Sequence, residues 1–191
     1  MNPFELFDTW YRAESARSDA RIPSACCLST AGLDGYPNAR FVSLKEILEE
    51  QFIITGPLNS RKGREIERSD KVALTFWWTN TERQVRIQGR AALISDELAD
   101  KYFADRPVDA QLVALISRQG EEIDDPNHLY ALVEQEALTH AKKSILRPKD
   151  WGAYAIGPVR IEFMEFEKTR FHKRTLFEHI RGVWHVKHLQ P

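Results

Sequence analysis

The sequence predicts a mainly β protein decorated by helices, built as a barrel or a sandwich of antiparallel strands. Three observations lead to this fold class. Short segments of alternating polarity recur in the first half of the chain and again near its C-terminus, as half-buried strands do. Glycine- and proline-containing turns separate some of them, as at 31–37. No glycine-rich dinucleotide-binding sequence follows an expected strand, which disfavours a doubly wound parallel sheet.

The chain begins with an expected helix. Asn2 suits the N-cap, Pro3 suits the first turn, and Glu5 stands where a capping box places an acid. We expect the helix to lay an aromatic face on the core. The residues of this face recur at helical spacing and are Phe4, Phe7, Trp10 and Tyr11.

The next segments predict three strands. Ala25–Thr30 and Arg40–Lys45 flank the turn at 31–37, which is the pattern of a hairpin. Phe52–Thr55 is expected to form the third strand.

A short helix and two more strands are expected next. The helix begins at Ser60 and runs to about Arg68. Val72–Trp78 is apolar and rich in residues that favour strands. The segment 85–91 alternates apolar and polar residues, which indicates a half-buried strand.

The pattern becomes helical after Ser95 and returns to strands at the C-terminus. The expected elements are helices at about 96–105, 107–117 and 126–143, a loop at 147–150, and strands that include 159–163 and 182–186. No repeat or low-complexity linker interrupts the chain. We therefore expect a single domain spanning 1–191, with a helical insert at about 96–143.

Composition argues against several classes of protein. The 27 Lys and Arg nearly balance the 28 Asp and Glu, so no overall field favours nucleic acid or a membrane surface. The two cysteines, Cys26 and Cys27, are adjacent and rarely bridge in that arrangement, which favours a reducing compartment. With no leader-like segment and no long apolar run, a soluble cytoplasmic protein is expected. The six histidines show no zinc-site spacing, so no metal is expected.

The most informative single feature is a set of alternating cations near the C-terminus. Arg170, His172 and Arg174 would all point to one face if their segment were a strand, and the apolar alternation at 159–163 favours a strand. Cations gathered on one face repel each other unless an anion lies among them. The segment therefore points to an anionic ligand. The alternative is a solvated basic edge that discourages aggregation between strands.

The start of the helix at Ser60 is a second candidate anion site. Free N–H groups at a helix start, with Arg61 and Lys62 beside them, suit a phosphate. Gly63 would allow a ligand to approach closely. The alternative is an ordinary capped helix on the surface.

Further polar residues could contact a ligand. The amide of Gln84 suits the edge of a heteroaromatic ring, although most exposed strand glutamines have no such role. Tyr102 and Arg106 are four apart in an expected helix and could grip a phosphate together, or the tyrosine could simply pack under the arginine stem. Arg40 and Lys45 would point to opposite faces of a regular strand. Both reach one ligand only through a bulge, a strand end or a second subunit.

Neither a Ser-His-Asp nor a Cys-His arrangement can be assigned from the spacing. We expect Trp77 and Trp78 to belong to the core and an interface and not to a stacking platform for bases.

Taken together, these segments resemble the pyridoxamine 5'-phosphate oxidase family. Each motif is weak alone, but their order and spacing are specific, and the likeness covers nearly the whole chain. The matching segments are Arg40–Lys45, Ser60–Lys62, Glu82–Val85, Tyr102–Pro107, Ser117–Gln119, Trp151–Gly152, Ile161–Phe163 and Arg170–Arg174.

The resemblance implies a split β-barrel that dimerises and binds two FMN at the subunit interface. It also implies oxidation of pyridoxine or pyridoxamine 5'-phosphate to pyridoxal 5'-phosphate, with oxygen as acceptor and hydrogen peroxide as product. Lys45, Tyr102 and Arg106 would hold the substrate phosphate, and Arg170 and His172 would act on the substrate ring as catalytic groups. The implied flavin contacts are Arg40, Lys45, Thr55, Arg61, Lys62, Gln84, Gln119, Met164 and Arg174.

Several positions depart from the family's usual pattern. Ala110 replaces a serine of the phosphate clamp, Met164 replaces a tryptophan beside the flavin, and Gly120 replaces a serine. The ending His188–Pro191 contains the Leu-Gln-Pro that also occurs in phenazine-biosynthesis oxidases, and the N-terminal extension that often covers the substrate is expected to be missing. These differences concern substrate choice more than the fold or flavin binding.

Three functions compete on this sequence. The first is an oxidase of phosphorylated B6 vitamers, favoured by the retained cations. The second is a related flavin oxidase of another aromatic compound, such as a dihydrophenazine carboxylate; Ala110 and the tail favour it, while Lys45 speaks against it. The third is a non-catalytic module that binds FMN or pyridoxal phosphate. A nucleic-acid binder has little support, because the basic residues are balanced and not interleaved with exposed aromatic residues.

Overall fold

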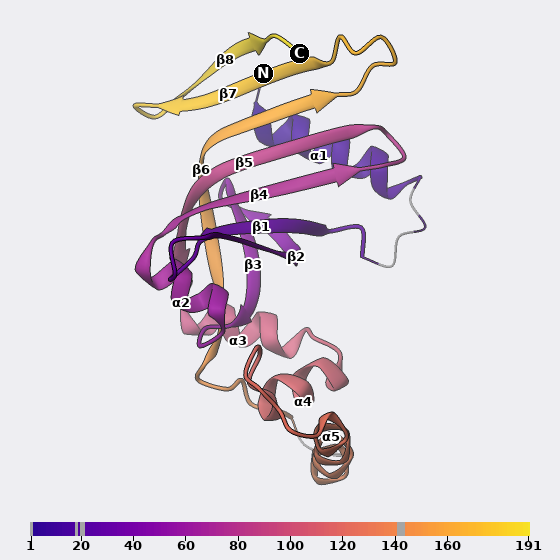
Figure 1. Ribbon diagram of the computed structural model, residues 1–191, viewed down its shortest axis with the longest axis vertical. Helices are drawn as coiled ribbons and strands as arrows, with labels where there is room; N and C mark the ends of the chain where they lie inside the picture. Colours follow the sequence, from indigo (N-terminus) through magenta and orange to yellow (C-terminus); the bar gives the residue numbers. More distant parts are fainter. Residues whose placement is uncertain (1, 18, 20–21, 141–143) are drawn as a thin grey trace.

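Six antiparallel strands close into a barrel, which confirms the mainly β fold with helices that the sequence predicts (Figure 1). The computed structural model describes residues 2–17, 19, 22–140 and 144–191. The strands are hydrogen-bonded in the order β3-β2-β1-β4-β5-β6, and β3 also pairs with β6, which closes the barrel. Their bounds are Ala25–Ala31 (β1), Pro37–Leu48 (β2), Gln51–Pro57 (β3), Lys71–Trp78 (β4), Arg83–Leu93 (β5) and Trp151–Glu165 (β6).

A C-terminal hairpin extends the sheet beyond β6. Strand β7 (Lys173–Ile180) pairs with the second half of β6, and β8 (Val183–Leu189) pairs with β7. The hairpin lies at the top of Figure 1, at the opposite end of the molecule from the helices that follow β5.

Helix α1 (Pro3–Ser15) packs on the barrel with the aromatic face that the sequence predicts. The backbone N–H of Phe4 donates to Oδ1 of Asn2 at 2.8 Å, so Asn2 is the N-cap. Phe7 is buried, and its ring lies 5.1 Å from the rings of both Phe52 and Phe76. Burying a side chain of this size contributes about 1.5–3 kcal/mol. Because so short a helix is only marginally stable alone, its packing on the barrel provides most of its stability.

Three helices stand between β5 and β6, as the sequence predicts: α3 (Asp96–Ala104), α4 (Val108–Ile116) and α5 (Pro126–His140). Helix α3 buries Tyr102 and Phe103 beside Trp151 at the start of β6. Arg147 ties the insert to this strand: its guanidinium pairs with two carboxylates of α3 and donates to the backbone oxygen of Trp151. The last positions expected in α5, 141–143, lie outside the described residues.

The prediction of a strand through residues 169–174 is wrong for its first part. Strand β6 ends at Glu165 and β7 begins at Lys173, and these two residues face each other across the ladder. The residues between them must therefore reverse the chain. The backbone N–H of Arg170 donates to the oxygen of Glu167 at 3.0 Å, and Arg170 has a φ of +67°. Arg170 and His172 consequently lie in the loop, and Arg174 alone of the three lies in a strand.

None of the helices in the described part of the chain is long and apolar enough to span a membrane. Within the same residues, no group of three or more His, Cys, Asp or Glu is arranged to hold a metal ion.

Candidate functional site

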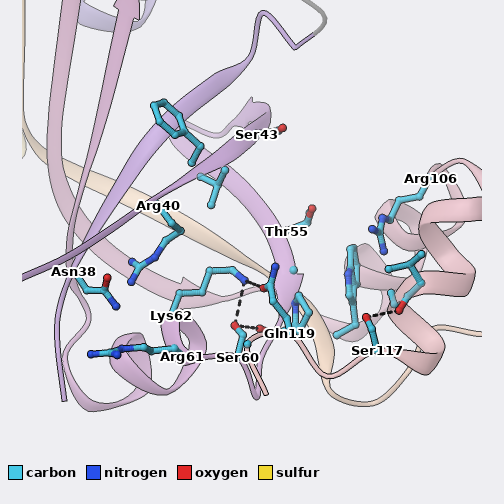
Figure 2. Close-up of a pocket in the computed structure, with 18 of the residues that line it drawn as sticks. Asn38, Arg40, Ser43, Thr55, Ser60, Arg61, Lys62, Arg106, Ser117 and Gln119 are labelled. Atoms are coloured by element: carbon cyan, nitrogen blue, oxygen red, sulfur yellow. Dashed lines mark hydrogen bonds between the residues drawn. The ribbon is translucent and has the colours of Figure 1, made fainter. Parts of the chain in front are cut away.

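A cavity of about 810 Å³ opens beside the start of α2 (Arg61–Arg68). Its wall is formed by β2, the end of β3, the start of α2 and the helical insert. Figure 2 shows Arg40, Arg61 and Lys62 on one side and Arg106, from the helical insert, on the other. The structure thus brings together six of the residues predicted to bind a ligand, which form a first cluster: Arg40, Thr55, Arg61, Lys62, Arg106 and Gln119.

The predicted helix start at Ser60 is confirmed. Ser60 is the N-cap of α2, and its Oγ accepts a hydrogen bond from the backbone N–H of Gly63 at 3.4 Å. The expectation that Gly63 makes room for a ligand is wrong. A Cβ at this position would lie 1.9 Å from the backbone oxygen of Leu58, so glycine is required by the packing of the preceding loop.

Lys62 brings a buried ammonium group to the cavity. Its Nζ donates to Oγ of Ser60 at 3.1 Å and to Oε1 of Gln119 at 2.6 Å, and both acceptors are neutral. Burial, together with the charge of Arg40 nearby, lowers the pKa of Lys62 to about 8. An anion beside Lys62 would offset this cost of burying a charge.

Glu65 is fully buried on α2 and anchors two cations of the cavity wall. Its Oε2 accepts from Nη2 of Arg40 at 2.8 Å and from Oγ1 of Thr30 at 2.6 Å. Its Oε1 accepts from Nε of Arg61 at 3.0 Å and from Nδ2 of Asn38 at 2.9 Å. Burial alone would raise the pKa of Glu65, but these four donors lower it to about 2. The carboxylate is therefore ionised throughout the neutral range.

A β-bulge lies at Lys45, but Lys45 does not join Arg40 in the cavity wall. The pairing of β2 with β3 shifts between Leu44 and Glu46, so Lys45 is the extra residue of the bulge. Lys45 Nζ lies 3.6 Å from Oδ2 of Asp105 and 5.5 Å from the centre of the Tyr102 ring. Lys45 therefore faces the helical insert from outside the cavity wall that Arg40 lines.

Tyr102 and Arg106 do not share a helix face, contrary to the prediction. Helix α3 ends at Ala104, so Arg106 lies in the turn before α4. The hydroxyl of Tyr102 donates to Oε1 of Glu46 at 2.5 Å, while the guanidinium of Arg106 lies 5.1 Å from the ring centre of Trp151. Nη1 of Arg106 is buried and has no hydrogen-bond partner among the described residues. Burial also lowers the pKa of Arg106, so this guanidinium is suited to receive an anion.

Five of the other predicted site residues form a second cluster on β5, β6, β7 and the loop between β6 and β7: Gln84, Met164, Arg170, His172 and Arg174. Gln84 faces Met164, and Met164 faces Arg174, so the three side chains form one row across one face of the sheet. Nε of Arg174 donates to Oε1 of Glu162 at 2.8 Å. His172 lies in the adjoining loop and is half-buried, whereas Arg170 is exposed.

The two clusters are separate within one chain. The cavity wall includes none of the second cluster's residues, which are Gln84, Met164, Arg170, His172 and Arg174. In Figure 1 the loop between β6 and β7 lies near the top, whereas α2 and α3 lie in the lower half. A single chain therefore offers two groups of candidate ligand-binding residues that face different surroundings.

The acidic partners of these cations were not among the residues that the sequence predicts for the site. Glu65 follows Arg61 by four residues in a helix, a spacing that could have suggested the pair. Its contacts with Thr30 and Arg40 join segments far apart in the chain and leave no local signal. The same holds for Glu46, which reaches Tyr102 from another element.

Comparison with known proteins relates the chain to one family over almost its full length. Residues 15–140 match the sequence profile of "Pyridoxamine 5'-phosphate oxidase", and residues 151–191 match "Pyridoxine 5'-phosphate oxidase C-terminal dimerisation region". A pyridoxine/pyridoxamine 5'-phosphate oxidase from Porphyromonas gingivalis is 36% identical over 191 residues, covering 99% of this chain and 88% of that protein. A protein of the same name from Rubrobacter xylanophilus is 38% identical over 190 residues, covering 100% of this chain and 87% of that protein.

Solved structures show the same relationship. PhzG from Burkholderia lata, in complex with tetrahydrophenazine-1-carboxylic acid, superimposes with a TM-score of 0.92 at 27% identity, covering 100% of this chain and 93% of that chain. An FMN-binding protein from Nostoc punctiforme, related to pyridoxamine 5'-phosphate oxidase, shares the fold with a TM-score of 0.82 at 16% identity. Its alignment covers 100% of this chain and 98% of that chain. From the profile and relative matches, the chain belongs to the pyridoxamine 5'-phosphate oxidase family, and residues 151–191 match that family's C-terminal dimerisation region.

Proposed function

We propose that this protein is an FMN-dependent oxidase that converts pyridoxamine or pyridoxine 5'-phosphate to pyridoxal 5'-phosphate, with oxygen as acceptor and hydrogen peroxide as product. The observation that carries the proposal is the unpartnered, buried Nη1 of Arg106 at the cavity. Lys45, which lies 3.6 Å from the neighbouring Asp105, and Tyr102 are also retained. A buried guanidinium with a free donor is matched by a phosphate, which accepts from arginine in a fork geometry. The relatives named for this reaction, at 36–38% identity, support the same substrate.

The residues at the cavity fit FMN. The start of α2 offers free backbone N–H groups, and Arg61 and Lys62 lie beside it, which is a favourable setting for a phosphate ester. Lys62 has only neutral acceptors, so a phosphate would supply the countercharge that its burial calls for. When bound, FMN supplies the hydride acceptor of the reaction, and the protein supplies binding and orientation.

A dimer would bring the two clusters into one site. The first cluster holds cations for phosphate groups, and the second offers Gln84, Met164 and Arg174 in one row with His172 beside it. The second cluster lies partly within residues 151–191, the region that matches the dimerisation profile. We infer that each FMN is held by the first cluster of one protomer and the second cluster of its partner.

The roles of the chain's own residues follow from their chemistry. Lys45 and Arg106 would hold the substrate phosphate, and this remote binding energy keeps the reacting carbon in place. Tyr102 donates to Glu46 and its ring lies against Lys45, so Tyr102 would position Lys45 for the substrate phosphate. Arg170 and His172 would orient the substrate ring, with His172 able to carry a proton.

A phenazine-type oxidase is the second candidate. PhzG from Burkholderia lata is structurally very similar, and that protein was crystallised with tetrahydrophenazine-1-carboxylic acid. Ala110 and the Leu-Gln-Pro ending favour this alternative. The cations Lys45 and Arg106 favour the vitamer oxidase. Two cations suit the phosphate ester of a vitamer, and the carboxylated tricyclic substrate has no phosphate ester.

The test is to add pyridoxine 5'-phosphate anaerobically to the FMN-loaded protein and to record the flavin absorption. Bleaching of the flavin with formation of one pyridoxal 5'-phosphate per flavin is expected. Unphosphorylated pyridoxine is the matched control and should bleach the flavin far more slowly. Bound flavin that stays oxidised with the phosphorylated vitamer but is reduced by a dihydrophenazine carboxylate would establish the second candidate. Failure to bind FMN would overturn both.

A further inference from the structure

Two aromatic rings connect β4 to the loop that carries His172. The rings of Trp77 and Phe166 lie 4.8 Å apart, centre to centre, at an interplanar angle of 77°. The ring of Phe166 lies 4.7 Å from the imidazole of His172 at 50°. Both geometries are the tilted contacts that aromatic rings favour. Trp77 is half exposed, so these rings belong to the surface of the barrel and not to its core.

Trp77 continues the row of the second cluster. Trp77 faces Gln84 across β4 and β5, Gln84 faces Met164, and Met164 faces Arg174. Directly paired residues of neighbouring antiparallel strands place their side chains on the same face. The Trp77 ring therefore lies on the face that carries the candidate flavin contacts, and Phe166 extends this face to His172.

The backbone of Glu167 fixes the orientation of the His172 imidazole. Its N–H donates to Nδ1 of His172 at 3.1 Å, and its carbonyl accepts from the N–H of Arg170 at 3.0 Å. Because Nδ1 accepts a hydrogen bond from an amide, it carries no proton of its own, so the neutral ring has its proton on Nε2. His172 then presents an N–H donor on the ring edge away from Glu167.

We propose that Trp77 and Phe166 are positioning residues for His172. They hold its ring against the Glu167 amide, which keeps it as the Nε2–H tautomer, so that Nε2–H can donate to an acceptor on the substrate ring. The proposal rests on the function proposed above and adds to it the donor atom and the two residues that aim it. Phe166 fixes the plane of the imidazole, and Trp77 fixes Phe166 from a strand of the barrel. A loop residue thereby gains the precision of a strand-borne one.

The kinetic test compares Phe166→Leu and Trp77→Leu with the wild-type protein, all loaded with FMN. Leucine keeps an apolar side chain but removes the ring contact. We expect kcat for pyridoxine 5'-phosphate to fall on the order of tenfold, with KM and FMN affinity nearly unchanged, because orientation affects the reaction and not phosphate binding. Phe166→Tyr and Trp77→Phe keep a ring and should restore kcat. Tyr130→Leu, at an exposed position of α5, is the matched control.

The spectroscopic test does not depend on turnover. In FMN-loaded protein with ¹⁵N-labelled histidine, with His172 assigned by its loss in His172→Gln, the resonances should show the Nε2–H tautomer in the wild-type protein and in Phe166→Tyr. Phe166→Leu should show a mixture of tautomers. A Nδ1–H tautomer in the wild-type protein, or an unchanged kcat in both leucine variants, would overturn the positioning role. Absent turnover in the wild-type protein would instead count against the proposed function, while the tautomer still tests the positioning.

Discussion

Replacing Glu65 with glutamine removes the buried charge that holds Arg40 and Arg61 in the cavity wall. The fold lowers the pKa of Glu65 from an ordinary 4.5 to about 2. Since each pKa unit corresponds to about 1.4 kcal/mol, ionised Glu65 contributes about 3 kcal/mol to folding at neutral pH. Glutamine keeps the shape but leaves the partly buried guanidinium of Arg40 without its carboxylate partner, whereas Arg61 keeps Asp34. Glu65→Gln should therefore lower the free energy of unfolding by about 3 kcal/mol at pH 7.

The pH dependence gives this prediction a second readout. Because the folded pKa is below the unfolded one, the stabilisation is complete well above pH 4.5 and is lost as the pH falls toward 2. At pH 4 the wild-type protein should have lost about 0.8 kcal/mol of this contribution. Glu65→Gln has no group to titrate at this position, so the difference between the two proteins should narrow by that amount.

Urea unfolding of the FMN-free proteins, at one fixed protein concentration and at pH 7 and pH 4, measures both quantities. Asp70→Asn is the matched control, because Asp70 pairs with Arg90 on the surface and its loss should cost less than about 1 kcal/mol. A loss below about 1 kcal/mol in Glu65→Gln, or a difference that does not change with pH, would refute the electrostatic role assigned to the buried carboxylate.

Three further predictions concern ligand binding and turnover. FMN affinity, measured by flavin fluorescence quenching, should weaken as the pH rises through about 8, because Lys62 loses its charge there, and Lys62→Gln should remove this dependence. Lys45→Ala should raise KM for pyridoxine 5'-phosphate roughly 10- to 100-fold, the worth of a charged hydrogen bond, while Arg160→Ala, a paired surface arginine, should leave KM unchanged. Arg170→Ala should reduce kcat strongly with FMN still bound; equal turnover would remove Arg170 from the mechanism.

The parts of the fold that the sequence predicts well are those set by neighbouring residues. Helix α1 follows from Asn2, Pro3 and the aromatic spacing, all within a few turns of chain, and the structure confirms each. Barrel closure depends instead on β3 pairing with β6, where Phe52 faces Ile156 across about a hundred residues of sequence. No local pattern distinguishes that pairing from a sandwich, so the sequence left both architectures open.

The candidate site shows the same division. Alternation of Arg170, His172 and Arg174 suggested a strand, but the pairing of Glu165 with Lys173 forces the chain to reverse between them. Alternating residue types occur in strands but also by chance. Only pairing with a neighbouring strand shows which of the two a segment is. For Lys45 the sequence correctly stated the problem, opposite faces of a regular strand. The bulge in β2 does not bring Lys45 to the cavity that Arg40 lines, so the two residues do not meet within one chain.

The charges of the first cluster suggest why two phosphate-bearing ligands fit this fold. Arg40 pairs with Glu65, Arg61 pairs with both Glu65 and Asp34, and Lys45 nearby lies beside Asp105. Among the described residues, Lys62 and Arg106 have no carboxylate partner, and burial lowers the pKa of both. These two cations come from different elements, the start of α2 and the turn before α4. Two uncompensated cations on opposite sides of one cavity are matched by two anions: the phosphate of FMN at Lys62 and the phosphate of the substrate at Arg106. A substrate without an anionic group would leave the buried Nη1 of Arg106 unpaired, which is the physical reason to favour a phosphorylated vitamer over an unphosphorylated one despite Ala110.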